Sequence, residues 1–244
     1  MLNISLKIFK SQYLRKKNQI LYSSIKTDCI KEIENIINNF LIENDSFVFE
    51  SVEKGFIKGR YTIFGKKPDK IWEFNDKKCK LIFRNKTKIL SGSPKKNIEK
   101  IIESFKFDIP KELPQISSII SGYFSYDIIR YIEKIPNKTK NDLGIPDTRI
   151  LRPKNLIIHD NFEKKLFFIV NIFGDEKIKK FKEKYDEIKK QIEDMIFLSN
   201  YDSHKMIADK INKVSKVKSN ISKKRFIISA SPLIFLDYHV LPKQ

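Results

Sequence analysis

The segment from Phe47 to Trp72 constrains the fold of this chain most strongly, because it predicts two short strands joined by a turn. Phe-Val-Phe begins the segment, and Tyr-Thr-Ile-Phe follows from Tyr61; both are runs of residues that favour strands. Gly55 and Gly59 interrupt the sequence between the two runs, as turn residues do. We therefore expect a hairpin around which the other strands and helices pack.

Three polar residues, Glu50, Ser51 and Arg60, lie in this predicted hairpin. A carboxylate, a hydroxyl and a guanidinium on paired strands can bind a molecule that carries both an ammonium and a carboxylate, such as an amino acid. The alternative is a surface hairpin with a solvated ion pair. Short motifs match by chance at a high rate, so spacing alone favours this alternative.

The remaining hydrophobic pattern predicts an α+β fold, in which a large and mostly antiparallel sheet carries helices on one face. Apolar residues that recur three and four positions apart predict helices at Asp28–Phe40, Pro94–Phe105 and Asp175–Phe197. Further strands are predicted at Leu2–Ile8, Gln19–Ser24, Lys70–Asn75, Cys79–Arg84, Lys86–Leu90, Asn155–Asp160 and Lys165–Ile172.

Individual residues add local expectations. Asp28 is the predicted N-cap of its helix, and Ile33 and Ile37 should lie on the buried face, where an Asp would be strongly destabilising. Gly122 should let its strand approach another backbone closely. Arg130 and Glu133 lie three residues apart on a helical turn, a spacing that predicts a local ion pair.

The charge of the chain is strongly positive but does not indicate a nucleic-acid groove. The formal net charge is +19, yet only seven of the 49 basic residues are Arg, the residue that reads phosphates and bases in two-pronged contacts. The lysines are dispersed along the whole chain. We interpret the charge as composition bias, so nucleic acid is not an expected partner.

The cysteines and histidines predict neither a metal centre nor a catalytic group. Cys29 and Cys79 lie far apart and outside any metal-ligand spacing, and His204 and His239 belong to no spacing that is typical of a catalytic constellation. No export signal and no apolar run long enough to span a bilayer is present. We therefore expect a cytoplasmic protein with reduced thiols.

Four segments of the chain form a set of dispersed motifs. They are Phe-Glu-Ser-Val-Glu (49–53), Gly-Arg-Tyr-Thr-Ile-Phe-Gly-Lys-Lys-Pro-Asp-Lys-Ile-Trp (59–72), Gly-Tyr-Phe-Ser-Tyr-Asp-Ile-Ile-Arg-Tyr-Ile-Glu-Lys-Ile-Pro (122–136) and Leu-Gly-Ile-Pro-Asp with the later Leu-Arg-Pro (143–153). In this order they resemble the N-terminal part of anthranilate synthase component I. The resemblance covers roughly Gln19–Arg225.

This resemblance implies an antiparallel sheet sandwich with helices on the outside, and a regulatory function. The family converts chorismate to anthranilate with Mg²⁺ and with ammonia from a glutamine amidotransferase partner. Its chorismate and metal residues lie in a C-terminal half, so the resemblance implies neither bound Mg²⁺ nor activity for this chain alone. The N-terminal half carries most of the site for the inhibitor tryptophan, and by resemblance Glu50 and Ser51 contact it, with Arg60 as a neighbour.

The chain departs from the family pattern at two places. Thr27-Asp28-Cys29-Ile30 stands where the family has a proline-containing segment that helps to close the tryptophan pocket. The sequence after Arg225 does not continue into the family's second half. By resemblance we expect an N-terminal-like domain at 1–198, a linker at 199–225, and an atypical tail at 226–244 that reads as a frameshift or a truncated gene.

Two alternatives remain open from the sequence. Aminodeoxychorismate synthase component I is related and shares the Gly-Tyr and Tyr-Asp elements, although the segments at 50–53 and 59–61 favour anthranilate synthase. A stand-alone module that binds an amino acid or nucleic acid is the second alternative.

Overall fold

A computed structural model describes residues 2–27, 30–50, 59–76, 78–83, 86–136, 141, 143–176 and 180–200. By internal contacts the chain divides into two units, Met1–Ser203 and His204–Gln244, and every described residue belongs to the first. The predicted N-cap Asp28, as well as Cys29, Ser51, His204 and His239, lie outside the described residues.

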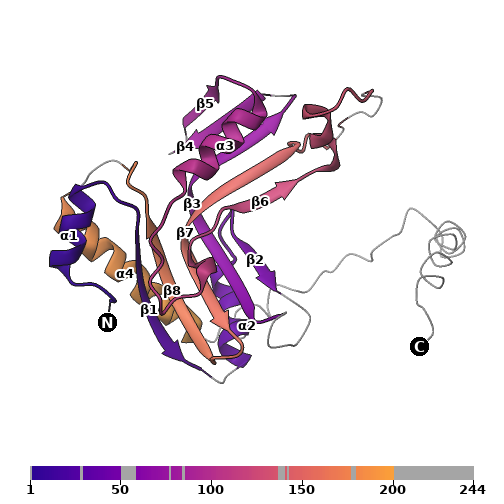
Figure 1. Cartoon of the computed structure of the whole chain (residues 1–244). Coiled ribbons are helices and arrows are strands. Elements are labelled where there is room, and N and C mark those ends of the chain that lie inside the picture. Colours follow the sequence, from indigo (N-terminus) through magenta and orange to yellow (C-terminus); the bar gives the residue numbers. More distant parts are fainter. Residues whose placement is uncertain are drawn as a thin grey trace, which may run out of the picture. The chain divides into compact units, whose positions relative to one another are not determined.

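The described strands form one curled antiparallel sheet (Figure 1), which confirms the predicted α+β fold. Its order is β1-β8-β7-β3-β4-β5; β2 pairs with β3, and β6 pairs with β7. The predicted hairpin is present, since β2 and β3 pair antiparallel. The strands are β1 Gln19–Lys26, β2 Phe47–Glu50, β3 Tyr61–Asn75, β4 Lys78–Phe83, β5 Lys86–Leu90, β6 Ser121–Phe124, β7 Thr148–Asp160 and β8 Lys165–Ile172.

Two long strands, β3 and β7, pair with each other and link the two halves of the sheet. The first part of β3 also pairs with β2, and its last part pairs with β4. Between these parts the register shifts at Pro68/Lys70, and Pro68 lies opposite Pro153. Proline donates no backbone hydrogen bond, and a bulge increases the local twist, so the sheet bends at this point.

Three helices cover one face of the half formed by β1, β8 and the adjoining part of β7. They are α1 (Leu6–Leu14), α2 (Ile30–Phe40) and α4 (Phe181–Asn200), which bury a shared core against the sheet. Fully buried members of this core include Phe9, Ile36, Phe168 and Ile188.

The helix α3 (Pro94–Ser104) packs on the opposite face, over β4. Ile150 of β7 belongs to the core beneath α3, whereas Leu156 and Ile158 belong to a core that the segment around Leu113 covers. Successive residues of a strand point to opposite faces of the sheet, so Ile150 lies on one face of β7 and Ile157 on the other. Helix α3 packs over Ile150 and α4 over Ile157, so the two helices lie on opposite faces of the sheet. The prediction that the helices share one face is therefore wrong. Two short 3-10 helices, η1 (Gln115–Ser117) and η2 (Tyr126–Tyr131), complete the elements.

The N-terminal segment is a helix, which corrects the strand predicted at Leu2–Ile8. Ser5 caps α1, since its side chain accepts a hydrogen bond from the backbone N–H of Ile8. Phe9 and Tyr13, one turn apart, stack with ring centroids 5.2 Å apart, and Phe9 also contacts Tyr185 of α4. Phe9 and Tyr13 lie on the same side of the chain only in a helix, and this arrangement lets α1 pack against α4. The alternating apolar pattern of Leu2–Ile8 is too short to specify a strand against this packing.

Two further predictions need correction, and one is confirmed. The helix predicted at Asp175–Phe197 begins at Phe181, because Asp175 and Glu176 form ion pairs with β7 instead. Arg130 pairs with Asp127, 2.8 Å away, rather than with Glu133. The prediction for Gly122 is confirmed, because a Cβ there would collide with the carbonyl oxygen of Arg149.

Candidate functional site

The candidate site predicted on the hairpin is built around Arg60, which immediately precedes β3. Its guanidinium binds Asp160 at the end of β7, with 3.1 Å from Nε to Oδ1 and 2.7 Å from Nη2 to Oδ2. The backbone N–H of Asn161 donates to the carbonyl of Arg60 at 2.8 Å. These contacts join the start of β3 to the turn between β7 and β8.

Two aromatic rings flank the Arg60 guanidinium. The rings of Tyr61 and Phe162 lie 5.0 and 5.3 Å from its central carbon, within the range of cation–π attraction. The hydrogen bond to Asp160 raises the pKa of Arg60 above its usual value, so it remains charged. About a third of the Arg60 side chain stays exposed, whereas Asp160 is buried. The site therefore presents a fixed cation between two rings.

Asp160 holds this arrangement in place and is a residue that sequence reasoning missed. Its Oδ1 also accepts the backbone N–H groups of Phe162 and Glu163, at 3.0 and 3.1 Å. Burial alone would raise the pKa of Asp160, but these bonds and the Arg60 guanidinium lower it below its ordinary value. An Asp that opens a turn and accepts these N–H groups is a recognisable local pattern. Its pairing with Arg60, a hundred positions away, is not visible in the sequence.

We expect the Arg60–Asp160 pair to stabilise the fold in a pH-dependent way. The pKa of Asp160 in the native state lies below the value of about 3.9 for an Asp in an unfolded chain. The stabilisation is therefore present above about pH 4 and is lost as the pH falls through the native pKa of Asp160. The difference in free energy of unfolding between the wild type and Asp160→Asn should thus be largest near pH 6 and shrink toward pH 3. Urea unfolding at a series of pH values measures it. A difference independent of pH would contradict the ionised pair.

The structure locates the other predicted site residues only in part. Glu50 is the last residue of β2, lies opposite Thr62 of β3, and has an exposed side chain. Arg60 lies two positions before Thr62, at the same end of the hairpin as Glu50. Ser51 is outside the described residues. An exposed carboxylate and a partly exposed guanidinium at one end of a hairpin can together hold an ammonium and a carboxylate.

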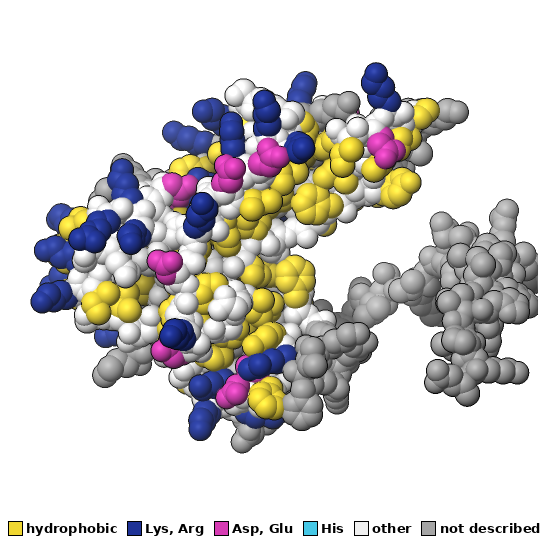
Figure 2. Space-filling model, viewed as in Figure 1, with side chains coloured by type: hydrophobic (Ala, Val, Ile, Leu, Met, Phe, Trp, Pro, Cys, Tyr) yellow, Lys and Arg dark blue, Asp and Glu magenta, His cyan; other side chains and the backbone are white. Residues whose placement is uncertain are grey.

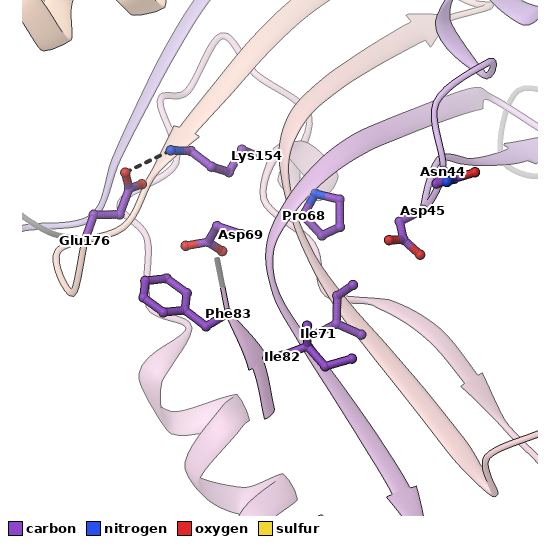
Figure 3. Close-up of a pocket in the computed structure, with 9 residues that line it drawn as sticks. All are labelled: Asn44, Asp45, Pro68, Asp69, Ile71, Ile82, Phe83, Lys154 and Glu176. Atoms are coloured by element: carbon purple, nitrogen blue, oxygen red, sulfur yellow. Dashed lines mark hydrogen bonds and ion pairs between the residues drawn. The ribbon is translucent and has the colours of Figure 1, made fainter. Parts of the chain in front are cut away.

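A pocket of about 390 Å³ at the bend of the sheet is a second candidate (Figure 3). Asp45, Asp69, Lys154 and Glu176 line it, together with apolar side chains of β3 and β4. Figure 3 shows Lys154 reaching Glu176, at 2.8 Å. Burial lowers the pKa of Lys154 although Glu176 opposes this shift.

The charged groups around this pocket are bound to one another. Asp69 accepts two hydrogen bonds from Arg152, and Asp45 lies 2.7 Å from Arg149. Each of these carboxylates is thus already neutralised by a guanidinium of the chain itself. We therefore interpret this cluster as a framework that fixes the bend.

The described residues offer neither a metal centre nor a reactive thiol. No cluster of three or more His, Cys, Asp or Glu side chains there could hold a metal ion. Cys79 is buried beneath α3, and burial raises the pKa of its thiol to about 11, so it is uncharged. No helix in this part of the chain is long and apolar enough to cross a membrane.

Several known proteins are similar to this chain in sequence. No protein-family model matches the chain. Anthranilate synthase component 1 of Cereibacter sphaeroides is 29% identical over 161 residues, which cover 64% of this chain and 32% of that protein. The corresponding protein of Acetivibrio thermocellus is 33% identical over 127 residues, which cover 52% and 26%. The chain thus matches about a third or less of the length of these relatives.

A solved structure shares the fold. The crystal structure of anthranilate synthase component I from Streptococcus pneumoniae superposes with a TM-score of 0.50 at 15% sequence identity. The match covers 83% of this chain and 43% of that one. Sequence and fold therefore agree on one group of proteins.

Proposed function

We propose that this chain, a homologue of anthranilate synthase component I, is the part of such an enzyme that binds tryptophan as a feedback inhibitor in tryptophan biosynthesis. In the proposed complete enzyme a chorismate-binding part converts chorismate to anthranilate with Mg²⁺, and a glutamine amidotransferase supplies ammonia. The homology carries this proposal. The chain alone is then inactive, because the chorismate-binding residues lie elsewhere.

The geometry of the hairpin supports an amino-acid ligand. In this proposal the exposed Glu50 carboxylate and the Ser51 hydroxyl bind the ammonium of tryptophan, and the Arg60 guanidinium binds its carboxylate. Asp160 fixes one edge of Arg60, so less conformational entropy is lost when the ligand binds.

Exposed apolar side chains support a covering partner for the same region. Strands β2 and β6 each pair with one neighbour in the described sheet and carry the exposed aromatic residues Phe49 and Phe124. Figure 2 shows hydrophobic side chains gathered along the surface around these two strands. Apolar surface of this kind marks an interface. The chorismate-binding part is the partner that we propose for it.

The proposal predicts that L-tryptophan stabilises the chain. A ligand bound only by the native state raises the free energy of unfolding, by about 2.7 kcal/mol at a hundred times its dissociation constant. Calorimetric titration and thermal unfolding with and without L-tryptophan measure this. Glu50→Gln should weaken binding about tenfold through the loss of a charge-assisted contact.

A matched control separates the site from general charge effects. Glu193→Gln removes another exposed carboxylate, on α4, and should leave tryptophan binding unchanged. Phenylalanine should bind less well if the indole is recognised. Absence of saturable heat with L-tryptophan, or equal affinity in the Glu50→Gln variant, would contradict the site.

A further inference from the structure

Another pocket, of about 270 Å³, lies between the C-terminal half of α4 and the bend of β3. Lys66 of β3 and Asn155 of β7 line it and face each other directly in the β3–β7 pairing. Helix α4 contributes Asp194, Met195 and Leu198. We name this space the α4 pocket. It shares no lining residue with the hairpin site or with the pocket of Figure 3.

Asn155 is the residue that points to a ligand. Its exposed fraction is 1%, and its Oδ1 atom has no hydrogen-bond partner among the described residues. An amide oxygen that is removed from water on folding and accepts no hydrogen bond in the folded chain destabilises the native state. A leucine at this position would not carry that penalty. A molecule in the pocket that donates a hydrogen bond removes this penalty.

The charges around the pocket define the rest of the ligand. Lys66 is 4% exposed; its Nζ lies 2.8 Å from Oε1 of Glu43, and an ammonium has two further hydrogens to donate. Lys67 and Asp194 are exposed residues that line the same space. Two cations, Lys66 and Lys67, and two carboxylates, Glu43 and Asp194, thus line one small volume. Met195 and Leu198 supply an apolar wall.

We propose that the α4 pocket binds a small zwitterion, namely a free amino acid with an aliphatic side chain. Its ammonium donates to Oδ1 of Asn155 and pairs with Asp194. Its carboxylate accepts hydrogen bonds from Lys66 and Lys67, and its side chain packs on Met195 and Leu198. This site is separate from the tryptophan site proposed above and does not depend on it.

The test uses L-leucine as the probe and Met195 as the reporter. The chain contains only three methionines, so methyl-labelled methionine gives few resonances, and a Met195→Leu variant assigns the one of interest. We expect millimolar L-leucine to shift the Met195 resonance in a saturable way. Asn155→Leu should weaken this response at least about tenfold, the equivalent of one lost hydrogen bond.

Controls distinguish a site from general effects. Asp194→Lys changes only an exposed rim residue and should also weaken binding, which keeps the test valid if Asn155→Leu does not fold. Acetate and methylammonium, each carrying one half of the zwitterion, should bind far more weakly than L-leucine. No saturable shift with L-leucine, or an unchanged response in both variants, would overturn the proposal and leave water as the partner of Asn155. A failure of tryptophan to bind would not affect this outcome.

Discussion

Replacing Arg152 by methionine should lower the free energy of unfolding by about 3–5 kcal/mol, the usual cost of removing one partner of a buried ion pair. The Arg152 side chain is 3% exposed. It donates to Asp69 at 2.7 and 2.6 Å and to Asp175 at 3.1 and 2.8 Å. Methionine fills similar space but leaves Asp69, whose side chain is only 11% exposed, without its cation.

The position of Arg152 explains why its loss should be felt beyond one pair. The guanidinium lies 3.8 Å from the centre of the Phe173 ring, in the turn that follows β8. Asp175 of that turn also binds Lys70 of β3. Arg152 thus joins the bend of the β3–β7 pair to the turn that follows β8. In the Arg152→Met variant we expect both segments to become less stable.

Urea unfolding of matched variants tests this prediction. Lys189→Met breaks an exposed pair with Glu193 on α4 and should change the stability by less than about 0.5 kcal/mol. The double variant Arg152→Met/Asp69→Leu should recover much of the loss, because apolar residues often replace a buried pair without penalty. If the free energy of unfolding of Arg152→Met equals that of the wild type, the ion pairs of Arg152 contribute little to stability.

Features that depend on neighbouring residues could be predicted from the sequence. The runs at Phe47 and Tyr61 gave the correct hairpin, and the spacing of apolar residues gave α2 and α3 within two residues. At Leu2–Ile8 local alternation gave the wrong element, because α1 owes its helical form to packing on α4, far along the chain.

Features that depend on distant residues could not be predicted. Asp160, which fixes Arg60, and Asp69, which binds Arg152, lie 100 and 83 positions from their partners. Nothing local marks either carboxylate as the partner of a particular arginine. The bend at Pro68 and Pro153 brings the second pair together, and a proline pattern alone does not specify that pairing.

In helix α2 the buried face differs in part from the one that the sequence predicts. Its apolar pattern placed Ile33 and Ile37 on the buried face, but the structure buries Ile36 completely and leaves Ile37 38% exposed. Ile33 is partly buried against the same core. Two adjacent isoleucines both satisfy helical spacing, and only the position of α4 decides which one faces inward.

Ile36→Asp should therefore destabilise the chain by at least about 3–5 kcal/mol, enough to unfold many domains of this size. The carboxylate would lie in the core that α2 shares with α4 and the sheet, among apolar residues such as Phe40 and Met195. The ammonium of Lys66, 4.4 Å from the centre of the Phe40 ring, is already paired with Glu43. Its pKa would rise, and the variant would be less unstable at low pH, where the carboxyl is protonated.

Ile37→Asp is the matched comparison, because it places the same charge one residue away on the same helix. Its side chain can reach water, so the expected loss is about 1 kcal/mol, mostly from weaker helix propensity and lost apolar contact. Urea unfolding monitored by Trp72, the single and buried tryptophan, measures both variants. Equal losses in the two variants would show that α2 is rotated relative to the described packing.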